Sequence, residues 1–361
     1  MKELNYRDFS FNRHSQNWEF GTPSLCQFEL TFRCGLHCRH CYTDCYNTPS
    51  FAQKELSLGR IKGILDTVRA LGVLWLCLTG GDPLVRNDFL DIYAYAKKKG
   101  FLTTVFTNGY SMTKEIAVYF KKKPPFSIEI TLNSTQAKLY EKIARVPHSF
   151  EKTMAGIALM KRYNLPLAVK MQVTRDNLSE FVQVKNFVAS IKARFKPSAN
   201  LHARLDGDMA PCRLRVSHEE FFRLRGNENV PDSECGRVYK EEVSGNNKLF
   251  QCAVLGGDGF QIDPQGNVFL CNLLRNPSFN VLKHDLRLGL RQLLSQMKSC
   301  MFHSNSECRT CNARSLCQSC PGKAYLETGD YEKPVPYFCR LTKLSLASIP
   351  HSAMHSLAKS A

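Results

Sequence analysis

The sequence predicts an α/β protein: a parallel sheet with helices outside it, as a barrel or part of one, followed by a small cysteine-rich domain. Two observations support this prediction. Short apolar strand patterns alternate with amphipathic helix patterns between residues 24 and 194, and repeated βα units of that kind form parallel sheets. The sixteen cysteines are bunched towards the two ends of the chain, with none between Cys77 and Cys212.

The expected elements follow one another at the spacing of βα units. The strand patterns cover residues 25–32, 73–79, 102–107, 127–132 and 167–173. The helix patterns cover residues 58–71, 87–99, 113–122, 150–163 and 178–194. In the first helix, Ser57 can cap the start, apolar residues recur every three or four positions, and Gly72 ends it.

The alternation stops near residue 195, and this divides the chain into expected segments. They are an N-terminal extension (1–23), the barrel core (24–195), a bridging region rich in proline and glycine (196–249), the cysteine-rich domain (250–340) and a tail without a clear signal (341–361). The cysteine-rich segment has few core-forming residues. It therefore needs another source of stability, and bound metal is the obvious one.

The composition excludes several protein classes. With 361 residues, 43% of them hydrophobic, the chain is too apolar to be disordered. It has neither a run of eighteen apolar residues nor an apolar N-terminal segment, so we expect a soluble cytoplasmic protein. The net charge of +17 would permit a nucleic-acid or acidic partner. Much of it, however, lies in the runs 97–99 and 121–123, near helix ends where it complements the helix dipole.

Clustered cysteines in a cytoplasmic chain indicate metal binding or catalysis, because disulfides are rare there. Cys34, Cys38 and Cys41 form a C-x₃-C-x₂-C pattern directly after the first strand. Three thiolates fill three of the four iron positions of a four-iron cluster and leave one iron open for another ligand. The alternative is a zinc site completed by Cys45 or His40.

The cysteine pattern is followed by Tyr42, and the second strand is followed by the turn Gly80-Gly81-Asp82-Pro83. With these motifs the chain resembles the radical S-adenosylmethionine (SAM) enzymes. The resemblance implies a partial (β/α)6-type barrel and a [4Fe–4S] cluster whose open iron binds the amine and carboxylate of SAM. It also implies release of a 5′-deoxyadenosyl radical that abstracts hydrogen, so that the cofactor carries the difficult chemistry.

The resemblance assigns cofactor contacts residue by residue. The cofactor-binding residues that it implies are Tyr42, Gly80, Gly81, Asp82, Asn108, Thr131 and Lys152. Asp82 stands where the family most often has glutamate, and Lys152 is expected on the methionine carboxylate. Thr131 and Asn108 could equally satisfy local backbone groups at strand ends. No general acid or base is identified, and Asp206 lies in an Asp-Gly pair that is more often a turn.

The C-terminal cysteines resemble those of the SPASM domain, which houses two auxiliary [4Fe–4S] clusters. The resemblance implies a nearer cluster held by Cys252, Cys271 and Cys320, and a farther one held by Cys308, Cys311, Cys317 and Cys339. The fourth ligand of the nearer cluster is either Cys235, Cys212 or a bound substrate. Zinc is the alternative for these cysteines. Cys26 and Cys77 lie in strand patterns and are expected in the core.

The resemblance implies a SAM-dependent oxidoreductase or lyase that matures a ribosomally made precursor peptide, by crosslinking, backbone excision or side-chain oxidation. It would need an external electron donor and a separate leader-binding partner protein. One alternative is a radical SAM enzyme acting on a small molecule such as a tetrapyrrole. The other is a zinc-stabilised, basic nucleic-acid-binding protein, which the charge permits. Neither a membrane nor a nucleic acid is expected as a partner of the enzyme.

Overall fold

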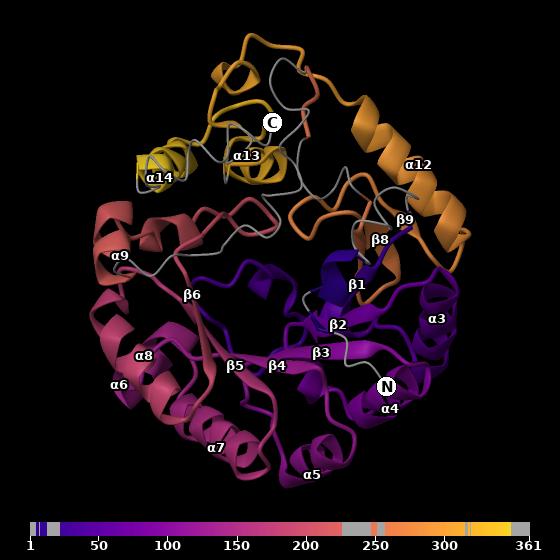
Figure 1. Ribbon diagram of the computed structural model, residues 1–361, viewed down its shortest axis with the longest axis vertical. Coiled ribbons are helices and arrows are strands. Elements are labelled where there is room, and N and C mark those ends of the chain that lie inside the picture. The colour runs from indigo at the N-terminus through magenta and orange to yellow at the C-terminus, as the bar shows by residue number, and fades with distance from the viewer. Residues whose placement is uncertain are drawn as a thin grey trace.

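Six parallel strands with helices on their outer side form the first part of the chain (Figure 1). The computed structural model describes residues 5–6, 8–12, 22–225, 247–250, 257–314, 317 and 319–347. The strands are β1 (Leu25–Thr31), β2 (Trp75–Gly80), β3 (Leu102–Thr107), β4 (Ser127–Thr131), β5 (Leu167–Gln172) and β6 (Arg194–Ser198). The helices are α2 (Pro49–Ala52), α3 (Leu58–Ala70), α4 (Phe89–Lys98), α5 (Lys114–Lys122), α6 (Ala137–Ala144), α7 (Ser149–Arg162) and α8 (Phe181–Ser190).

The cysteine-rich region continues the same sheet. Strand β7 (Gly259–Ile262) pairs in parallel with β1, and β8 (Asn267–Phe269) and β9 (Phe279–Asn280) follow antiparallel. The sheet order is therefore β6-β5-β4-β3-β2-β1-β7-β8-β9. The remaining helices are α9 (His218–Arg225), α12 (Leu286–Ser299), α13 (Pro321–Thr328) and α14 (Pro336–Ala347). The C-terminal region is thus attached to the barrel core through backbone hydrogen bonds at the β1 edge.

The expected partial barrel is confirmed, and the five expected strands lie within two residues of their predicted positions. The sixth strand, β6, lies across the boundary where the sequence predicted the start of a bridging region. Its sequence, RFKPS, is half-exposed and contains Pro197, which a sheet tolerates at an edge strand such as this one. A strand of this kind lacks the apolar signal by which the other five are recognised.

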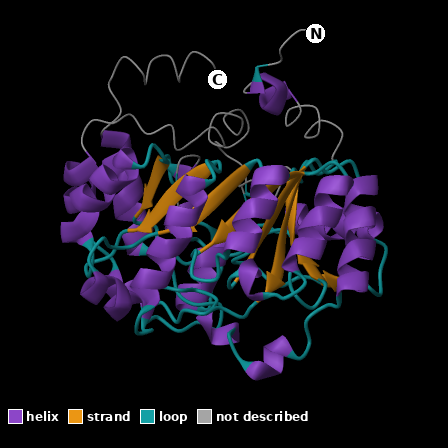
Figure 2. Cartoon of the chain, turned by 90° about the horizontal axis from the view of Figure 1, so that it is seen from below, coloured by secondary structure: helices purple, strands orange, loops and turns teal. Residues whose placement is uncertain are grey.

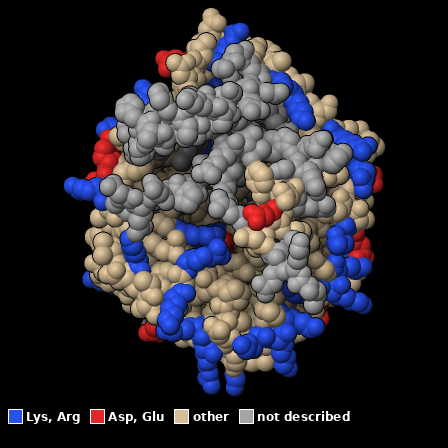
Figure 3. All heavy atoms as spheres, in the orientation of Figure 1, with Lys and Arg blue, Asp and Glu red and all other residues tan. Residues whose placement is uncertain are grey.

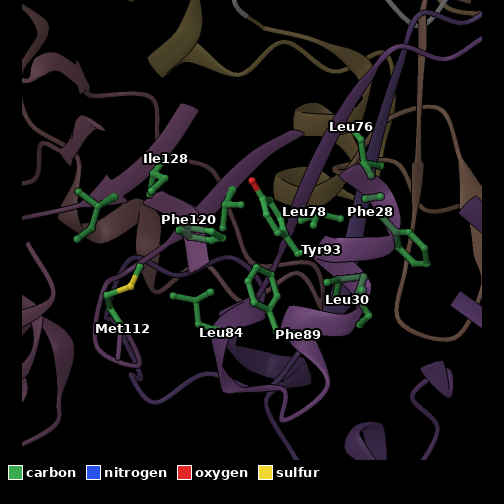
Figure 4. Close-up of a cluster of buried hydrophobic side chains, with 14 of the residues drawn as sticks. Phe28, Leu30, Leu76, Leu78, Leu84, Phe89, Tyr93, Met112, Phe120 and Ile128 are labelled. Atoms are coloured by element: carbon green, nitrogen blue, oxygen red, sulfur yellow. The ribbon is translucent and has the colours of Figure 1, made fainter. Parts of the chain in front are cut away.

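The hydrophobic core lies between the strands and the outer helices. Figure 2, the view from below, shows the strands with helices around them. Phe28 of β1 and Leu78 of β2 belong to the same cluster as Phe89 and Tyr93 of α4 and Phe120 of α5 (Figure 4). The Tyr93 and Phe120 rings lie 4.8 Å apart between centroids. This core fixes the strand ends that carry the site. No helix in the described part of the chain is long and apolar enough to cross a membrane.

Lysines occupy the last turns of α4 and α5, as the sequence predicts. At those helix ends their charges complement the partial negative charge of the last carbonyl groups. Figure 3 shows Lys and Arg side chains along the lower edge of the molecule, where Figure 1 places these helices.

Candidate active site

A cavity of about 730 Å³ lies at the carboxyl ends of the parallel strands. Parallel α/β folds gather their catalytic and cofactor-binding residues at this end of the sheet. One wall is residues 32–44, here called the cysteine loop, and another is the turn after β2. The far wall comes from β4, β5 and β6 together with residues 200–202.

Cys34, Cys38 and Cys41 all line this cavity. Asn47 fixes the backbone of Cys34 from both sides: its Oδ1 accepts from the Cys34 amide at 3.1 Å, and its Nδ2 donates to the Cys34 carbonyl at 3.2 Å. The Cys34 sulfur accepts hydrogen bonds from the Leu36 amide at 3.4 Å and from Asn108 Nδ2 at 3.2 Å. Such donors stabilise negative charge on sulfur, which suits a metal-bound thiolate.

Helix α6 holds the cysteine loop from the side. The amides of His37 and Arg39 donate to the carbonyls of Ala144 and Ile143, each at 3.0 Å. These carbonyls belong to the last turn of α6, where intrahelical partners run out. The Arg39 guanidinium also pairs with Asp176, in the segment after β5, at 2.5 Å. Loop, helix and strand end are therefore joined at one point beside the cavity.

Without a bound metal, the three thiols are held in their protonated form. Burial raises the pKa of Cys34, Cys38 and Cys41. Because thiols bind metal as thiolates, metal binding at these residues would release protons. Among the described residues, we find no group of three His, Cys, Asp or Glu side chains that could hold a single metal ion. A four-iron cluster makes no such demand, since each thiolate binds a different iron.

The turn after β2 requires glycine because the chain passes very close to the end of β1. A Cβ atom on Gly80 would lie 2.0 Å from the Thr31 carbonyl oxygen, and Gly80 has a φ of +131°. A Cβ on Gly81 would lie 2.4 Å from the Arg33 carbonyl oxygen. Both glycines line the cavity. The backbone atoms of Gly80 and Gly81 can therefore contact a ligand in the cavity. The close approach of β1 excludes a side chain at either position whether or not a ligand is bound.

The Asp82 side chain lies behind the wall of the cavity rather than on its surface. It is fully buried and connects the turns after β2 and β3. It accepts hydrogen bonds from the Leu84 amide at 3.0 Å, the Thr107 hydroxyl at 2.9 Å and the Asn108 amide at 3.1 Å. Burial raises the pKa of Asp82 to about 6. The carboxylate orders the cavity wall from behind, and its contact with SAM stays a prediction.

Of the other predicted cofactor contacts, Tyr42, Asn108 and Thr131 line the cavity and Lys152 does not. The Tyr42 hydroxyl accepts from Asn272 Nδ2 at 3.3 Å, so Tyr42 connects the cavity to the C-terminal region. The Lys152 ammonium donates to the Tyr110 hydroxyl at 2.9 Å and lies over that ring. Five of the seven predicted cofactor-binding residues therefore line the cavity, and the two that do not are Asp82 and Lys152.

Comparison with known families decides the class of enzyme. The model of the Radical SAM superfamily matches residues 28–188, which run from β1 to α8 and include both the cysteine loop and the glycine turn. Residues 28–188 form a radical SAM domain, which makes the protein a SAM-dependent radical SAM enzyme. The predicted dependence on SAM and on a [4Fe–4S] cluster is thereby confirmed, and an enzyme is favoured over the zinc-stabilised nucleic-acid-binding protein.

Two curated relatives of this radical SAM enzyme match it along most of their length. Both are named AdoMet-dependent heme synthase. The one from Methanosarcina barkeri is 25% identical over 337 residues, covering 87% of this chain and 96% of the relative. The one from Nitratidesulfovibrio vulgaris is 26% identical over 349 residues, covering 88% and 93%.

Solved structures confirm the fold of the radical SAM enzyme, including its cysteine-rich C-terminal region. Streptococcus suis SuiB bound to the precursor peptide SuiA has a TM-score of 0.64 at 17% identity, over 92% of this chain and 81% of that one. Native anSMEcpe with bound AdoMet and the Kp18Cys peptide has a TM-score of 0.66 at 13% identity, over 93% and 99%. Identities this low show the fold alone.

The far wall of the radical SAM site carries charged residues that the sequence comparison did not assign. Glu129 of β4, Lys170 of β5 and Lys196 of β6 all line the cavity. The sequence could have indicated Lys170, because a lysine inside an apolar strand is uncommon unless it is paired. The two lysines hold the pKa of Glu129 below its usual value, although burial acts in the opposite direction.

Two histidines of the radical SAM site are neutral. Burial lowers the pKa of both His40 and His202 to about 4. His202 Nδ1 lies 2.8 Å from the Ala203 carbonyl oxygen, which can only accept, so Nδ1 carries the proton and Nε2 a lone pair. His40 Nδ1 is buried and lacks a hydrogen-bond partner within the described structure. Both side chains line the cavity, so each can offer a polar atom to a ligand.

The C-terminal cysteines fall into two neighbourhoods. Burial raises the pKa of Cys308 and Cys339, and Cys317 and Cys311 add to both shifts. Burial also raises the pKa of Cys271, to which Cys320 contributes. The two ligand sets that the resemblance implies stay predictions. Cys252 and Cys235 lie outside the described residues.

Two other residues considered in the sequence, Cys212 and Asp206, do not line the cavity. Cys212 lies near Arg215, Glu327 and Asp208. Asp206 Oδ1 accepts from the Asp208 amide at 3.1 Å, which is the turn geometry that an Asp-Gly pair favours.

Proposed function

We propose that this radical SAM enzyme acts on a tetrapyrrole in the synthesis of haem, by abstracting hydrogen from a side chain of the ring. The observation that supports this proposal is the similarity to two AdoMet-dependent heme synthases along nearly the whole of both chains. The peptide-bound structural neighbours share only 13–17% identity. The tetrapyrrole alternative therefore has better support than the peptide maturation expected from the motifs.

The residues around the cavity suit that chemistry. Cys34, Cys38 and Cys41 would hold the cluster, which when bound supplies the electron that cleaves SAM to methionine and a 5′-deoxyadenosyl radical. The backbone of Gly80 and Gly81 and the Thr131 hydroxyl would orient SAM along the strand ends. A substrate bound in the cavity would displace water from beside SAM, which protects a reactive species from side reactions.

The far wall supports a tetrapyrrole on chemical grounds. A tetrapyrrole is a flat apolar ring with carboxylate side chains, so it needs apolar contact and positive charge together. The cavity offers Phe106, Phe195 and Leu201 beside the ammonium groups of Lys170 and Lys196. Its volume of about 730 Å³ is within the range of about 300–1,000 Å³ typical of cofactor and ligand pockets.

The decisive experiment compares substrates on the anaerobically reconstituted enzyme supplied with SAM and reductant. Coproporphyrin III, with and without iron, is the tetrapyrrole probe, and mass spectrometry follows both the porphyrin and 5′-deoxyadenosine. We expect a change in porphyrin mass together with 5′-deoxyadenosine, both abolished in Cys34→Ala. Unchanged porphyrin beside a modified precursor peptide would instead establish peptide maturation, the candidate that the structural neighbours favour.

The auxiliary clusters are part of the same proposal. Their support is the two cysteine neighbourhoods and the likeness of the C-terminal region to SuiB and anSMEcpe. Three four-iron clusters predict about twelve irons per chain. Cys308→Ala is expected to remove about four irons while leaving the reductive cleavage of SAM intact. Near-stoichiometric zinc instead of iron after anaerobic reconstitution would contradict this part of the proposal.

A further inference from the structure

Two lysines stand side by side on the far wall of the cavity. Lys170 of β5 pairs in register with Thr131 of β4 on one side and with Lys196 of β6 on the other. Residues in register on parallel strands project from the same face of the sheet, and all three line the cavity. The lysine pair (Lys170 and Lys196) therefore faces the space beside the SAM site.

The Glu129 carboxylate pairs with both lysines. Glu129 Oε2 lies 2.6 Å from Lys170 Nζ, and Glu129 Oε1 lies 2.5 Å from Lys196 Nζ. Like charges on neighbouring strands repel each other, and one carboxylate neutralises only one of the two ammonium groups. Among the described residues these three groups thus carry one excess positive charge. Figure 3 shows a group of Lys and Arg side chains near the place where Figure 1 draws β6.

The two lysines are not equivalent. Lys170 lies over the Phe106 ring, with its Nζ 3.2 Å from the centroid, and its side chain is 32% exposed. Lys196 is 42% exposed and lies on the edge strand β6, where one side of the strand has no neighbour. Lys196 can therefore turn towards a ligand while Lys170 and Glu129 remain a neutral pair.

The carboxylate of SAM is not the partner that this position suits. By family resemblance, the methionine end of SAM binds the iron held by the cysteine loop, which follows β1. The Lys196 ammonium lies instead against the Glu129 carboxylate of β4, in register with Lys170 of β5, on the wall opposite the cysteine loop. We therefore assign the excess charge of this wall to a substrate that lies beside SAM.

We propose that Lys196 binds a carboxylate side chain of the substrate and so orients the substrate beside SAM, while Glu129 stays paired with Lys170. This inference rests on the proposed function, because a tetrapyrrole with carboxylate side chains supplies the ligand. No covalent step is involved. Lys196 is a positioning residue that selects carboxylate-bearing substrates over neutral analogues of the same shape.

The test measures binding to the reconstituted, SAM-loaded enzyme by fluorescence titration. The probes are coproporphyrin III and its tetracarboxamide, which has the same ring without charge. The variants are Lys196→Met, Lys196→Arg and the control Lys161→Met, an exposed residue of α7. For Lys196→Met we expect affinity for the acid to fall roughly tenfold or more, since a charge-assisted hydrogen bond is lost. Affinity for the amide should not change, and Lys196→Arg should restore most of the acid binding.

Each other outcome overturns a specific statement. If the wild type binds the acid and Lys196→Met binds it equally well, the role of Lys196 is wrong while the tetrapyrrole proposal stands. If the wild type binds neither porphyrin, both proposals fail. Equilibrium dialysis of SAM supplies the last arm: a matching loss of SAM affinity in Lys196→Met would assign the contact to the carboxylate of SAM and overturn the inference.

Discussion

Single residues at the glycine turn set how closely β2 approaches the cysteine loop. Gly80 and Gly81 face backbone carbonyl oxygens of residues 31–33 at distances that exclude a Cβ atom. The motif GG is therefore needed for packing whether or not SAM is bound. Gly80 and Gly81 are thus needed for packing and are also the residues predicted to contact SAM. The sequence motif alone could not tell these two roles apart.

Gly80→Ala should destabilise the protein severely. The new Cβ would overlap the Thr31 carbonyl, and alanine is strained at a φ of +131°. We expect the free energy of unfolding to fall by about 3 kcal/mol or more. Gly63→Ala is the matched control, because no atom lies within 4 Å of its Cβ position on the exposed face of α3. It should instead raise stability by about 0.5–1 kcal/mol. Urea denaturation of both variants checks the contrast.

His202 gives a pH dependence whose sign follows from its burial. Its pKa in the folded protein is about 4, below the ordinary value of 6.5, so folding favours the neutral ring. This stabilisation is complete above pH 6.5 and is lost as the pH falls towards 4, by about 3 kcal/mol in total. His202→Gln should lose less stability over that range than the wild type. Urea denaturation of both proteins across that pH range measures the loss, and an equal loss of unfolding free energy in His202→Gln and the wild type would contradict the assignment.

At the scale of elements, α6 and the segment after β5 hold the cysteine loop in place. The loop has no regular structure of its own along Cys34–Cys41, so its shape depends on two backbone hydrogen bonds to α6 and on the pair of Arg39 with Asp176. Sequence reasoning missed α6, a helix of eight residues. The cluster site therefore depends on an element with little sequence signal.

Asp176→Asn should loosen the cysteine loop without unfolding the barrel. The variant removes the charge that Arg39 pairs with, and Lys142, 3.8 Å from Asp176, loses its partner as well. We expect faster loss of the cluster absorbance when a chelator is added to the reconstituted enzyme. Asp66→Asn, which breaks an exposed pair with Lys99 far from the loop, serves as the control. Equal rates in both variants would show that the Arg39 pair does not support the loop.

At the scale of the whole molecule, an ion pair joins the C-terminal region to the barrel. Arg275 binds Glu29 of β1 through two parallel hydrogen bonds, both of 2.8 Å, and Glu29 is 1% exposed. The guanidinium also lies against the rings of Phe32 and Phe269. The pairing of β7 with β1 joins the two regions in one sheet, and the Arg275–Glu29 pair adds a side-chain contact between them.

Arg275→Met should cost about 3–5 kcal/mol of unfolding free energy, because it leaves a buried carboxylate without its partner. Adding Glu29→Gln should recover part of that loss, since the orphaned charge is then gone. Arg340→Met, which breaks a largely exposed pair with Glu219, should change stability little. Thermal denaturation of the four proteins checks the order, and a double variant no more stable than Arg275→Met would refute the buried-charge argument.

Much of the fold could be predicted because hydrophobic periodicity is a local property of the chain. The five strands from β1 to β5 carry strong apolar patterns, and their helices repeat at helical spacing. Strand β6 could not be found in this way, since Pro197 and its half-exposed neighbours give no such pattern. The pairing of β7 with β1 joins residues more than two hundred positions apart, and no local signal reports it.

By itself the sequence determined the chemistry: the spacing of Cys34, Cys38 and Cys41, followed by the glycine turn, specified a radical SAM enzyme. Only the tertiary structure decided where other side chains point. It buried Asp82 behind the cavity wall, left Lys152 outside the cavity, and brought the lysine pair into register on the far wall. The spacing of cysteines along one short loop is a local property that can be read from the sequence. Side-chain direction and strand register depend on contacts between distant segments, which form only when the sheet curves into the barrel.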